Sequence, residues 1–165
     1  MDTSVRAMKS DDCTEVMKIY NEALDERIAT FNTEPVSADE VRKWPMDGTV
    51  LVASSGNSVI GFVRAFSYSV RACYSGIVEF SIYVSSQERG KGVGSRLMGD
   101  FLEILTSEGR WKVLSRVFPE NLPSLSLLRK HGFREVGTYR NHATLDDIWR
   151  DVVIVERLLG KNSTA

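Results

Sequence analysis

The sequence predicts a single α+β domain with a mixed, largely antiparallel central sheet of about seven strands flanked by about four helices. Three observations favour this fold class. Most apolar segments alternate with a period of two, and several follow one another at hairpin-like spacing. Fewer segments carry the three-to-four-residue apolar spacing of helices. The 165 residues contain no repeat, linker or low-complexity block, so we expect one domain at 1–160 and a disordered tail at 161–165.

The first part of the chain predicts two helices and three strands. The polar residues 10–12 supply helix caps, and an apolar stripe at 16–24 continues that helix. Ser37 and Glu40 match a capping box, which predicts the start of a second, short helix. The expected elements are a strand at 5–8, helices at 10–29 and 37–44, and strands at 50–54 and 59–68 on either side of the Gly56-Asn57 turn.

The second part of the chain predicts two further helices and four strands. Gly109 ends the longer helix, and Pro123 is tolerated in the first turn of the shorter one. The expected elements are strands at 77–84, 112–118, 133–140 and 151–158, and helices at 93–107 and 121–130.

The composition favours a cytoplasmic protein whose ligands are small molecules. A net charge of −1 gives no reason to expect nucleic acid or a membrane surface as partner, so attraction for an anionic ligand must be local. No apolar run approaches the ~20 residues of a membrane span. Two cysteines, Cys13 and Cys73, do not form a disulfide framework, and with His131 and His142 they give no metal-ligand spacing.

The most informative stretch is the glycine-rich segment Arg89-Gly90-Lys91-Gly92-Val93-Gly94-Ser95. It follows an alternating strand pattern at 79–84 and precedes an apolar helical stripe at 97–105. Glycines let a backbone turn tightly near a ligand, while free N–H groups at a helix start favour negative charge. The segment therefore predicts a phosphate-binding turn, although a simple surface turn that caps a helix is an alternative.

Two familiar phosphate loops do not fit these residues. No Gly-Lys pair is followed by Ser or Thr, as a P-loop requires, and Ser95 stands where a dinucleotide fingerprint needs its third glycine. What fits is Arg-x-x-Gly-x-Gly, which Arg89, Gly92 and Gly94 supply. This pattern resembles the pyrophosphate loop of the GCN5-related N-acetyltransferases (GNAT), which implies the GNAT fold and acetyl-coenzyme A as cofactor. The cofactor contacts so implied are Tyr83, Val84, Arg89, Gly90, Lys91, Gly92, Val93, Gly94 and Ser95.

A second motif strengthens the resemblance. Asn121-Leu122-Pro123-Ser124 is followed eight residues after Ser124 by Gly132-Phe133, and this looks like the Asn-led helix of the same superfamily. That helix packs along the pantetheine arm, so the resemblance makes Asn121 and Ser124 cofactor contacts. Each feature alone also fits an ordinary helix cap. The two motifs together, in the expected order, support the superfamily assignment.

Residues 3–159 resemble one branch of that superfamily, the phosphinothricin acetyltransferase-like enzymes. The matching positions are Phe31, Thr33-Glu34-Pro35, Arg71, Tyr74, Val78-Glu79, Tyr83-Val84, Trp149 and Asp151-Val152. This branch acetylates the α-amine of small amino acids and of glutamate-like toxic analogues: phosphinothricin, methionine sulfoximine and arsinothricin. The expected partners are therefore an amino-acid-like small molecule and, as a homodimer, a second copy of the chain.

Glu79 is the expected general base. On an alternating strand it shares a face with Ser81 and Tyr83, and it aligns with the catalytic glutamate of the branch. A glutamate with a pKa near ~4.3 is a poor base for an ammonium, so Glu79 needs burial or a bridging water. The alternative is a solvated charge on the strand face. His142 is the next candidate for a catalytic role.

Arg71 is the expected clamp for a substrate carboxylate, because a planar guanidinium binds a carboxylate with two hydrogen bonds. Arg64 is its rival, and Phe31 and Tyr74 are expected to wall the substrate pocket. The resemblance implies that a backbone N–H near Val84 stabilises the oxyanion.

Two positions depart from the family. Leu128 occupies the place of a tyrosine acid, and Asp146 the place of a histidine, for which His142 is a possible substitute. The proton donor to the leaving thiolate is therefore unassigned.

The favoured function is an acetyl-coenzyme A-dependent N-acetyltransferase in which the acceptor amine attacks the thioester directly. A protein N-terminus or a polyamine is the alternative acceptor. From another class, a non-catalytic acyl-coenzyme A-binding module would keep the loop but not need Glu79. A Rossmann-type nucleotide binder fits least well, because the glycine pattern is wrong.

Overall fold

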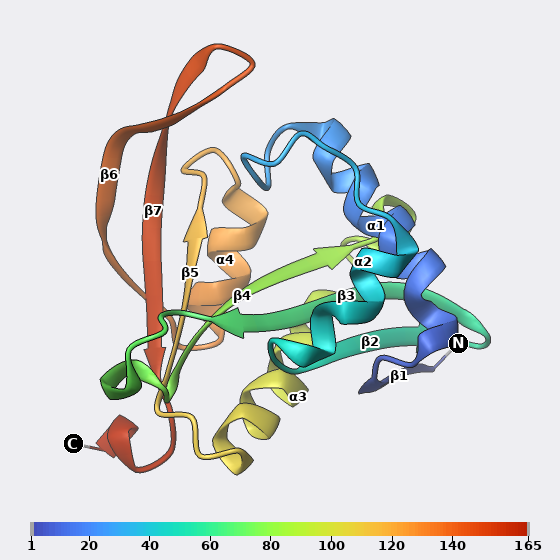
Figure 1. The fold of residues 1–165 in the computed structure, drawn as a ribbon, viewed down its shortest axis with the longest axis horizontal. Coiled ribbons are helices and arrows are strands. Elements are labelled where there is room, and N and C mark those ends of the chain that lie inside the picture. Colours follow the sequence, from blue (N-terminus) through green and yellow to red (C-terminus); the bar gives the residue numbers. More distant parts are fainter. Residues whose placement is uncertain (1, 165) are drawn as a thin grey trace.

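A seven-stranded sheet with the order β1-β2-β3-β4-β5-β7-β6 forms the centre of the molecule (Figure 1). The computed structural model describes residues 2–164. The strands are β1 Thr3–Ala7, β2 Val50–Ser55, β3 Ser58–Ser67, β4 Ile77–Val84, β5 Lys112–Val117, β6 Arg134–Leu145 and β7 Ile148–Leu158. The helices are α1 Cys13–Glu26, α2 Ala38–Lys43, α3 Val93–Ser107 and α4 Leu122–Lys130. The predicted α+β architecture is confirmed.

The two faces of the sheet carry separate hydrophobic cores. Helix α3 packs its buried residues, among them Leu97 and Phe101, against β2 to β5 on one face, where α4 adds Leu128. Helices α1 and α2 cover the other face, where Val16 and Trp44 pack against β2 and β3. Burial of these side chains supplies most of the driving force for folding.

The sheet is antiparallel except between β4 and β5. These two strands pair in parallel over only three residue pairs, from Ile77↔Lys112 to Glu79↔Leu114. Beyond Glu79, β4 continues in register with β3 as far as Val84↔Gly61. Beyond Glu79, the edge of β4 that faces β5 is therefore no longer paired with that strand, although it lies at the centre of the sheet.

Local caps fix the starts of the helices. The Ser37 hydroxyl accepts a hydrogen bond from the Glu40 N–H at 3.2 Å, as the predicted capping interaction requires. Asn121 caps α4, because its Oδ1 accepts from the Ser124 N–H at 3.3 Å. Gly92 precedes α3 at a φ of 85°, a left-handed conformation that glycine adopts without strain.

The expected bounds of β4 and α3 are confirmed, but α1 is shorter than predicted. It ends at Glu26 because Arg27 takes a left-handed φ of 57° and its N–H bonds to the Leu24 carbonyl. The apolar stripe stops at Leu24, so the expected continuation to residue 29 had no core to pack against.

The last hairpin is longer than predicted. The strand expected at 133–140 continues to Leu145, and the strand expected at 151–158 already begins at Ile148. The hairpin therefore projects beyond β5 (Figure 1). Asp146 and Asp147 form the turn, with φ values of 51° and 64°. Positive φ at both central residues is typical of a tight hairpin turn, but this turn contains neither of the dipeptides that usually predict one, Asn-Gly and Asp-Gly.

The C-terminal residues differ from the expected tail. Gly160–Thr164 form a 3-10 helix, and the Asn162 Nδ2 donates to the Trp111 carbonyl at 3.1 Å. The expectation of disorder at 161–165 is therefore wrong for 161–164, and Ala165 lies outside the described residues.

Candidate functional site

A groove of about 480 Å³ lies between the end of α1, the end of β4 and the starts of α3 and α4. Arg89, Gly90 and Gly92 of the loop and the first residues of α3 form one wall. Its lining contains most of the predicted cofactor contacts: Tyr83, Val84, Arg89, Gly90, Gly92, Val93, Gly94, Ser95, Asn121 and Ser124. Of the predicted set, only Lys91 is absent from this lining; its Nζ contacts Glu88 Oε2 at 3.2 Å.

The glycine loop leaves its backbone accessible. Gly90 and Gly92 have φ values of 75° and 85°, and a Cβ added at either would meet nothing within 4 Å. Glycine is therefore favoured at both positions by the positive φ of the backbone, and not because a neighbouring group leaves no room for a side chain. The free N–H groups at the start of α3 point toward the same region, so the loop fits a phosphate group.

Gly94 has a different role from the two preceding glycines. A Cβ at this position would lie 3.2 Å from the Leu127 side chain, so Gly94 lets α3 approach α4 closely. The neighbouring Ser95 hydroxyl lies 2.8 Å from the Nε2 of His131, which follows α4. These contacts hold the two walls of the groove together.

The loop arginine is held by contacts with other residues of the groove lining. Arg89 Nε donates to the Val84 carbonyl at 3.0 Å, and its two Nη atoms contact the Glu26 carboxylate. Arg89 therefore ties the loop to β4 and α1.

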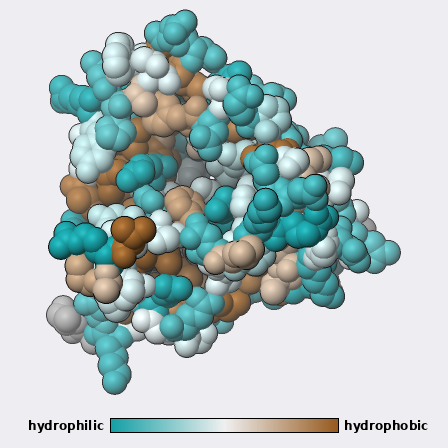
Figure 2. Space-filling view, in the orientation of Figure 1, coloured by the Kyte–Doolittle hydropathy of each residue, from teal (hydrophilic) through white to brown (hydrophobic). Residues whose placement is uncertain are grey.

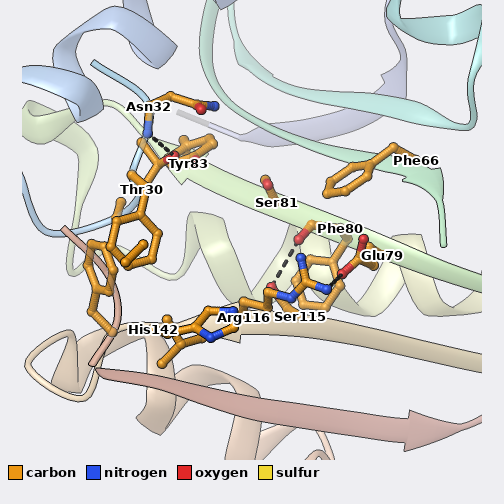
Figure 3. A pocket seen from close by; sticks show the side chains of 15 residues that line it. Thr30, Asn32, Phe66, Glu79, Phe80, Ser81, Tyr83, Ser115, Arg116 and His142 are labelled. Atoms are coloured by element: carbon orange, nitrogen blue, oxygen red, sulfur yellow. Dashed lines mark hydrogen bonds and ion pairs between the residues drawn. The ribbon is translucent and has the colours of Figure 1, made fainter. Parts of the chain in front are cut away.

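A second cavity of about 420 Å³ lies where the β6–β7 hairpin faces the segment after α1 (Figures 2 and 3). Its charged and titratable lining residues are Glu79, Tyr83, Arg116 and His142. The rest of the lining is Ala29, Thr30, Phe31, Asn32, Phe66, Phe80, Ser81, Ser115, Phe118, Ala143 and Val152. The cavity therefore brings a carboxylate and a guanidinium together within walls of mixed polar and aromatic residues.

Glu79 is buried in this cavity, with 8% of its surface exposed. Burial raises the pKa of its carboxyl, and the Arg116 guanidinium, whose Nη2 lies 3.5 Å from Oε1, only partly offsets this increase. A carboxylate with a raised pKa is a better proton acceptor at neutral pH than an exposed one. The alternative of a solvated strand-face charge is excluded by this burial.

The other predicted residues of this region are divided between the cavity and its surroundings. Phe31 and His142 line the cavity, where Phe31 packs edge-on against Phe118 at 4.7 Å between ring centroids. Arg71 and Tyr74 do not line it. Arg71 is exposed, with its guanidinium carbon 5.4 Å from the Tyr74 ring centroid.

Tyr83 and Leu128 also have well-defined surroundings. Tyr83 packs against Tyr20 and Phe62 in the α1 core, and burial raises the pKa of its phenol. Leu128, at the position where the family places a tyrosine, is buried in the α3 core.

Sequence reasoning missed Arg116, the one guanidinium among the cavity-lining residues in the described part of the chain. It is one of two charged residues in β5, with Lys112, and shares a face with Leu114, which pairs with Glu79. The strand pattern at 112–118 indicates on which face of the strand Arg116 lies. Its proximity to Glu79 depends on the parallel register, which the sequence does not specify.

A narrow space of about 40 Å³ lies between the groove and the cavity. It shares Tyr83 with both, Arg116 and Ser115 with the cavity, and Asn121 and Ser124 with the groove. The space follows the end of the β4–β5 ladder. The groove and the cavity are therefore neighbours along β4, with this narrow space between them.

Two further features bear on the type of site. Among residues 2–164, no group of three or more His, Cys, Asp or Glu side chains is arranged to hold a metal ion. No helix in the same range is long and apolar enough to cross a membrane.

Residues 16–133 match the model of the Acetyltransferase (GNAT) family. YwnH of Bacillus subtilis is 33% identical, covering 94% of this chain and 99% of that protein. Phosphinothricin N-acetyltransferase of Streptomyces coelicolor is 29% identical, covering 96% and 97%. A phosphinothricin acetyltransferase from Sinorhizobium meliloti, solved in complex with AcCoA, has a TM-score of 0.92 at 26% identity, covering all of this chain and 92% of that one. The chain therefore belongs to the GNAT acetyltransferase family, with relatives in the phosphinothricin branch that its motifs predicted.

Proposed function

We propose that this enzyme transfers the acetyl group of acetyl-coenzyme A to the α-amine of a small amino acid or of a glutamate-like analogue of the phosphinothricin, methionine sulfoximine or arsinothricin type. One observation carries the proposal. The buried carboxylate of Glu79, with its raised pKa, lies in a cavity adjacent to a groove whose open glycine backbone fits a phosphate.

The groove residues hold the acetyl donor. The backbone at Gly90, Gly92 and the start of α3 would meet its pyrophosphate, and Asn121 and Ser124 on α4 would line its pantetheine arm. When bound, acetyl-coenzyme A supplies an activated thioester. The net charge of the chain is close to zero, but binding the phosphates does not need a basic surface, because the start of α3 attracts their negative charge.

Glu79 then acts on the acceptor. An α-amine arrives mainly as an ammonium, and its lone pair is exposed only after a proton is lost. The Glu79 carboxylate accepts that proton, directly or through a water, and the free amine attacks the thioester carbonyl carbon. The same attack places negative charge on the carbonyl oxygen, and the acetyl group passes to the amine as the C–S bond breaks and coenzyme A leaves as its thiolate.

Backbone N–H groups of β4 are available for that oxygen. Ser115 Oγ donates to the Phe80 carbonyl at 2.9 Å from the β5 side, and Arg89 Nε donates to the Val84 carbonyl. The N–H and C=O groups of successive residues point to opposite edges of a strand, so those of Phe80, Ile82 and Val84 point toward β5. The pairing between β4 and β5 has already ended at these residues. The Ile82 and Val84 N–H groups are therefore candidate oxyanion donors, while the proton donor to the thiolate stays unassigned.

The remaining predictions concern the cellular context. A homodimer is supported by the exposed apolar residues of the β6–β7 hairpin: Val136, Tyr139, Ile148 and Trp149. Sedimentation equilibrium would test it. A cytoplasmic location stays a prediction from composition.

Coenzyme A release tests the proposed function. Acetyl-coenzyme A is incubated with a panel of amino acids that includes methionine sulfoximine and phosphinothricin, together with polyamines and an N-terminal peptide. We expect rapid release only with amino acids. Faster release with polyamines or the peptide would favour those acceptors, and no release despite cofactor binding would favour the non-catalytic module.

A further inference from the structure

We propose that Arg116 binds the carboxylate of the acceptor and so makes the enzyme selective for amines that carry one. This inference rests on the proposed function and assigns the recognition of the acceptor to a residue of β5. The α-carboxylate would pair with Arg116 while the α-amine faces Glu79.

The position of Arg116 suits this role. It shares a strand face with Leu114, the partner of Glu79 in the parallel ladder, and its Nη2 lies 3.5 Å from Glu79 Oε1 (Figure 3). Its side chain is 56% exposed, whereas that of Glu79 is 11% exposed. Arg116 therefore has free N–H donors on the cavity side, and it makes one long contact with Glu79 in place of a two-bond pair.

The charges of the cavity match those of an amino acid. An α-amino acid holds an ammonium and a carboxylate on one carbon, so a site for it needs an anion and a cation a few ångströms apart. Glu79 and Arg116 are such a pair, and Phe31, Phe66 and Phe118 are the aromatic residues of the lining around them. A guanidinium–carboxylate contact is stronger beside such apolar groups than in open water.

The other arginines near the sheet centre are engaged elsewhere. The Arg64 guanidinium lies over the Trp44 ring at 4.2 Å and near the Phe66 ring at 5.2 Å, and burial lowers its pKa. Arg150 donates to Glu120 at 3.2 Å and lies over the Phe118 ring. Arg71 lies outside the cavity lining, so an acceptor that reached it would extend out of the cavity.

The same contact couples acceptor binding to the base. Arg116 favours the charged form of Glu79, and a substrate carboxylate that pairs with Arg116 neutralises that influence. The substrate carboxylate thus offsets part of the lowering of the Glu79 pKa that Arg116 and the arriving ammonium cause. The other titratable side chains lining the cavity are Tyr83, on the strand of Glu79, and His142, on β6.

Steady-state kinetics with paired acceptors test the inference. Methionine sulfoximine is compared with its carboxamide, which lacks the carboxylate, in the parent enzyme and in Arg116→Ala, Arg116→Lys and Arg71→Ala. We expect the parent to prefer the acid, and Arg116→Ala to lose about tenfold or more in kcat/KM for the acid, mainly through KM, while the amide changes much less because it senses only the altered base. Arg116→Lys should recover part of the loss, and Arg71→Ala should change KM less.

Controls separate this inference from the proposed function. Arg129→Ala removes a surface arginine of α4 that contacts Glu135 and should leave both acceptors unchanged. Thermal stabilisation by methionine sulfoximine, in the presence of coenzyme A, measures acceptor binding without turnover. If Arg116→Ala or Arg116→Lys keeps the full preference for the acid, the inference is wrong although the function stands. If binding depends on Arg116 but no amine is acetylated, the proposed function fails and the assignment of Arg116 stands.

Discussion

Arg89 and Glu26 form a two-bond ion pair across 63 residues of sequence, with Nη1···Oε2 at 2.7 Å and Nη2···Oε1 at 2.5 Å. The arginine of the glycine motif therefore joins the loop to the end of α1. Its positive charge is balanced by Glu26, and the Arg89 contact holds the pKa of the Glu26 carboxyl below its usual value. In the proposed cofactor site, recognition of the phosphates would therefore be left mainly to the backbone of the loop and of α3.

Glu26→Gln should loosen this attachment. Loss of the charged pair removes a restraint on the loop, so we expect weaker acetyl-coenzyme A binding and a slightly lower Tm, with a stability loss below ~1 kcal/mol because both side chains are partly exposed. Isothermal titration calorimetry and thermal unfolding measure the two effects. Glu135→Gln, which breaks the exposed contact to Arg129, should change neither. Equal binding by Glu26→Gln and the parent would contradict this role of the ion pair.

Gly92→Asp should abolish cofactor binding. The substitution places a carboxylate in the open space beside the loop, where it would repel a pyrophosphate. A thermal shift assay with acetyl-coenzyme A should show stabilisation of the parent and none of the variant. Gly92→Asn has the same shape and a similar tolerance of positive φ but no charge, so it should keep part of the shift. A folded Gly92→Asp that binds normally would show that phosphate is not bound at this loop.

Glu79→Gln should separate catalysis from binding. The amide keeps the shape of the carboxylate but cannot accept a proton from the ammonium, so turnover should fall by ~10²–10⁴. Acetyl-coenzyme A affinity should stay the same, because Glu79 does not line the groove. An unchanged rate near neutral pH would move the base to another residue, and His142→Asn would then be measured under the same conditions.

Glu79→Gln should also change how stability depends on pH. Burial raises the folded-state pKa of Glu79 above its ordinary value of 4.5, so the folded protein holds this proton more tightly than the unfolded chain. The associated stability is present below pH 4.5 and is lost as the pH rises through the folded pKa. We therefore expect Glu79→Gln to raise the Tm at pH 7 and the gain to shrink toward pH 4.5. Glu103→Gln, an exposed change on α3, should give no such trend; a pH-independent gain for Glu79→Gln would contradict the raised pKa.

Residues with strong local signals were predicted well, and residues that depend on long-range register were not. The glycines before α3 and the Ser37 and Asn121 caps act within a few residues, so their elements were located from the sequence. The Asp146-Asp147 turn adopts positive φ without a glycine, and the hairpin was therefore predicted too short.

The acceptor cavity shows the same division. The strand alternation of β4 located Glu79, because its neighbours fix which face it occupies. Arg116 reaches Glu79 only through pairing between strands that are separated by a loop and a whole helix. Arg71 was chosen by resemblance, which does not tell whether a loop side chain faces the cavity; its predicted role stays a prediction.

The short contact between β4 and β5 divides the sheet into two half-sheets with different tasks. The N-terminal half carries Glu79, the glycine loop and the amides of β4, whereas the C-terminal half brings Arg116 and His142 to the cavity. Only three residue pairs join the halves, so the two halves meet at the cavity mainly through side chains. If the proposed roles hold, changes at the cavity-facing positions of β5 and β6 would alter the acceptor while the groove and Glu79 stay the same.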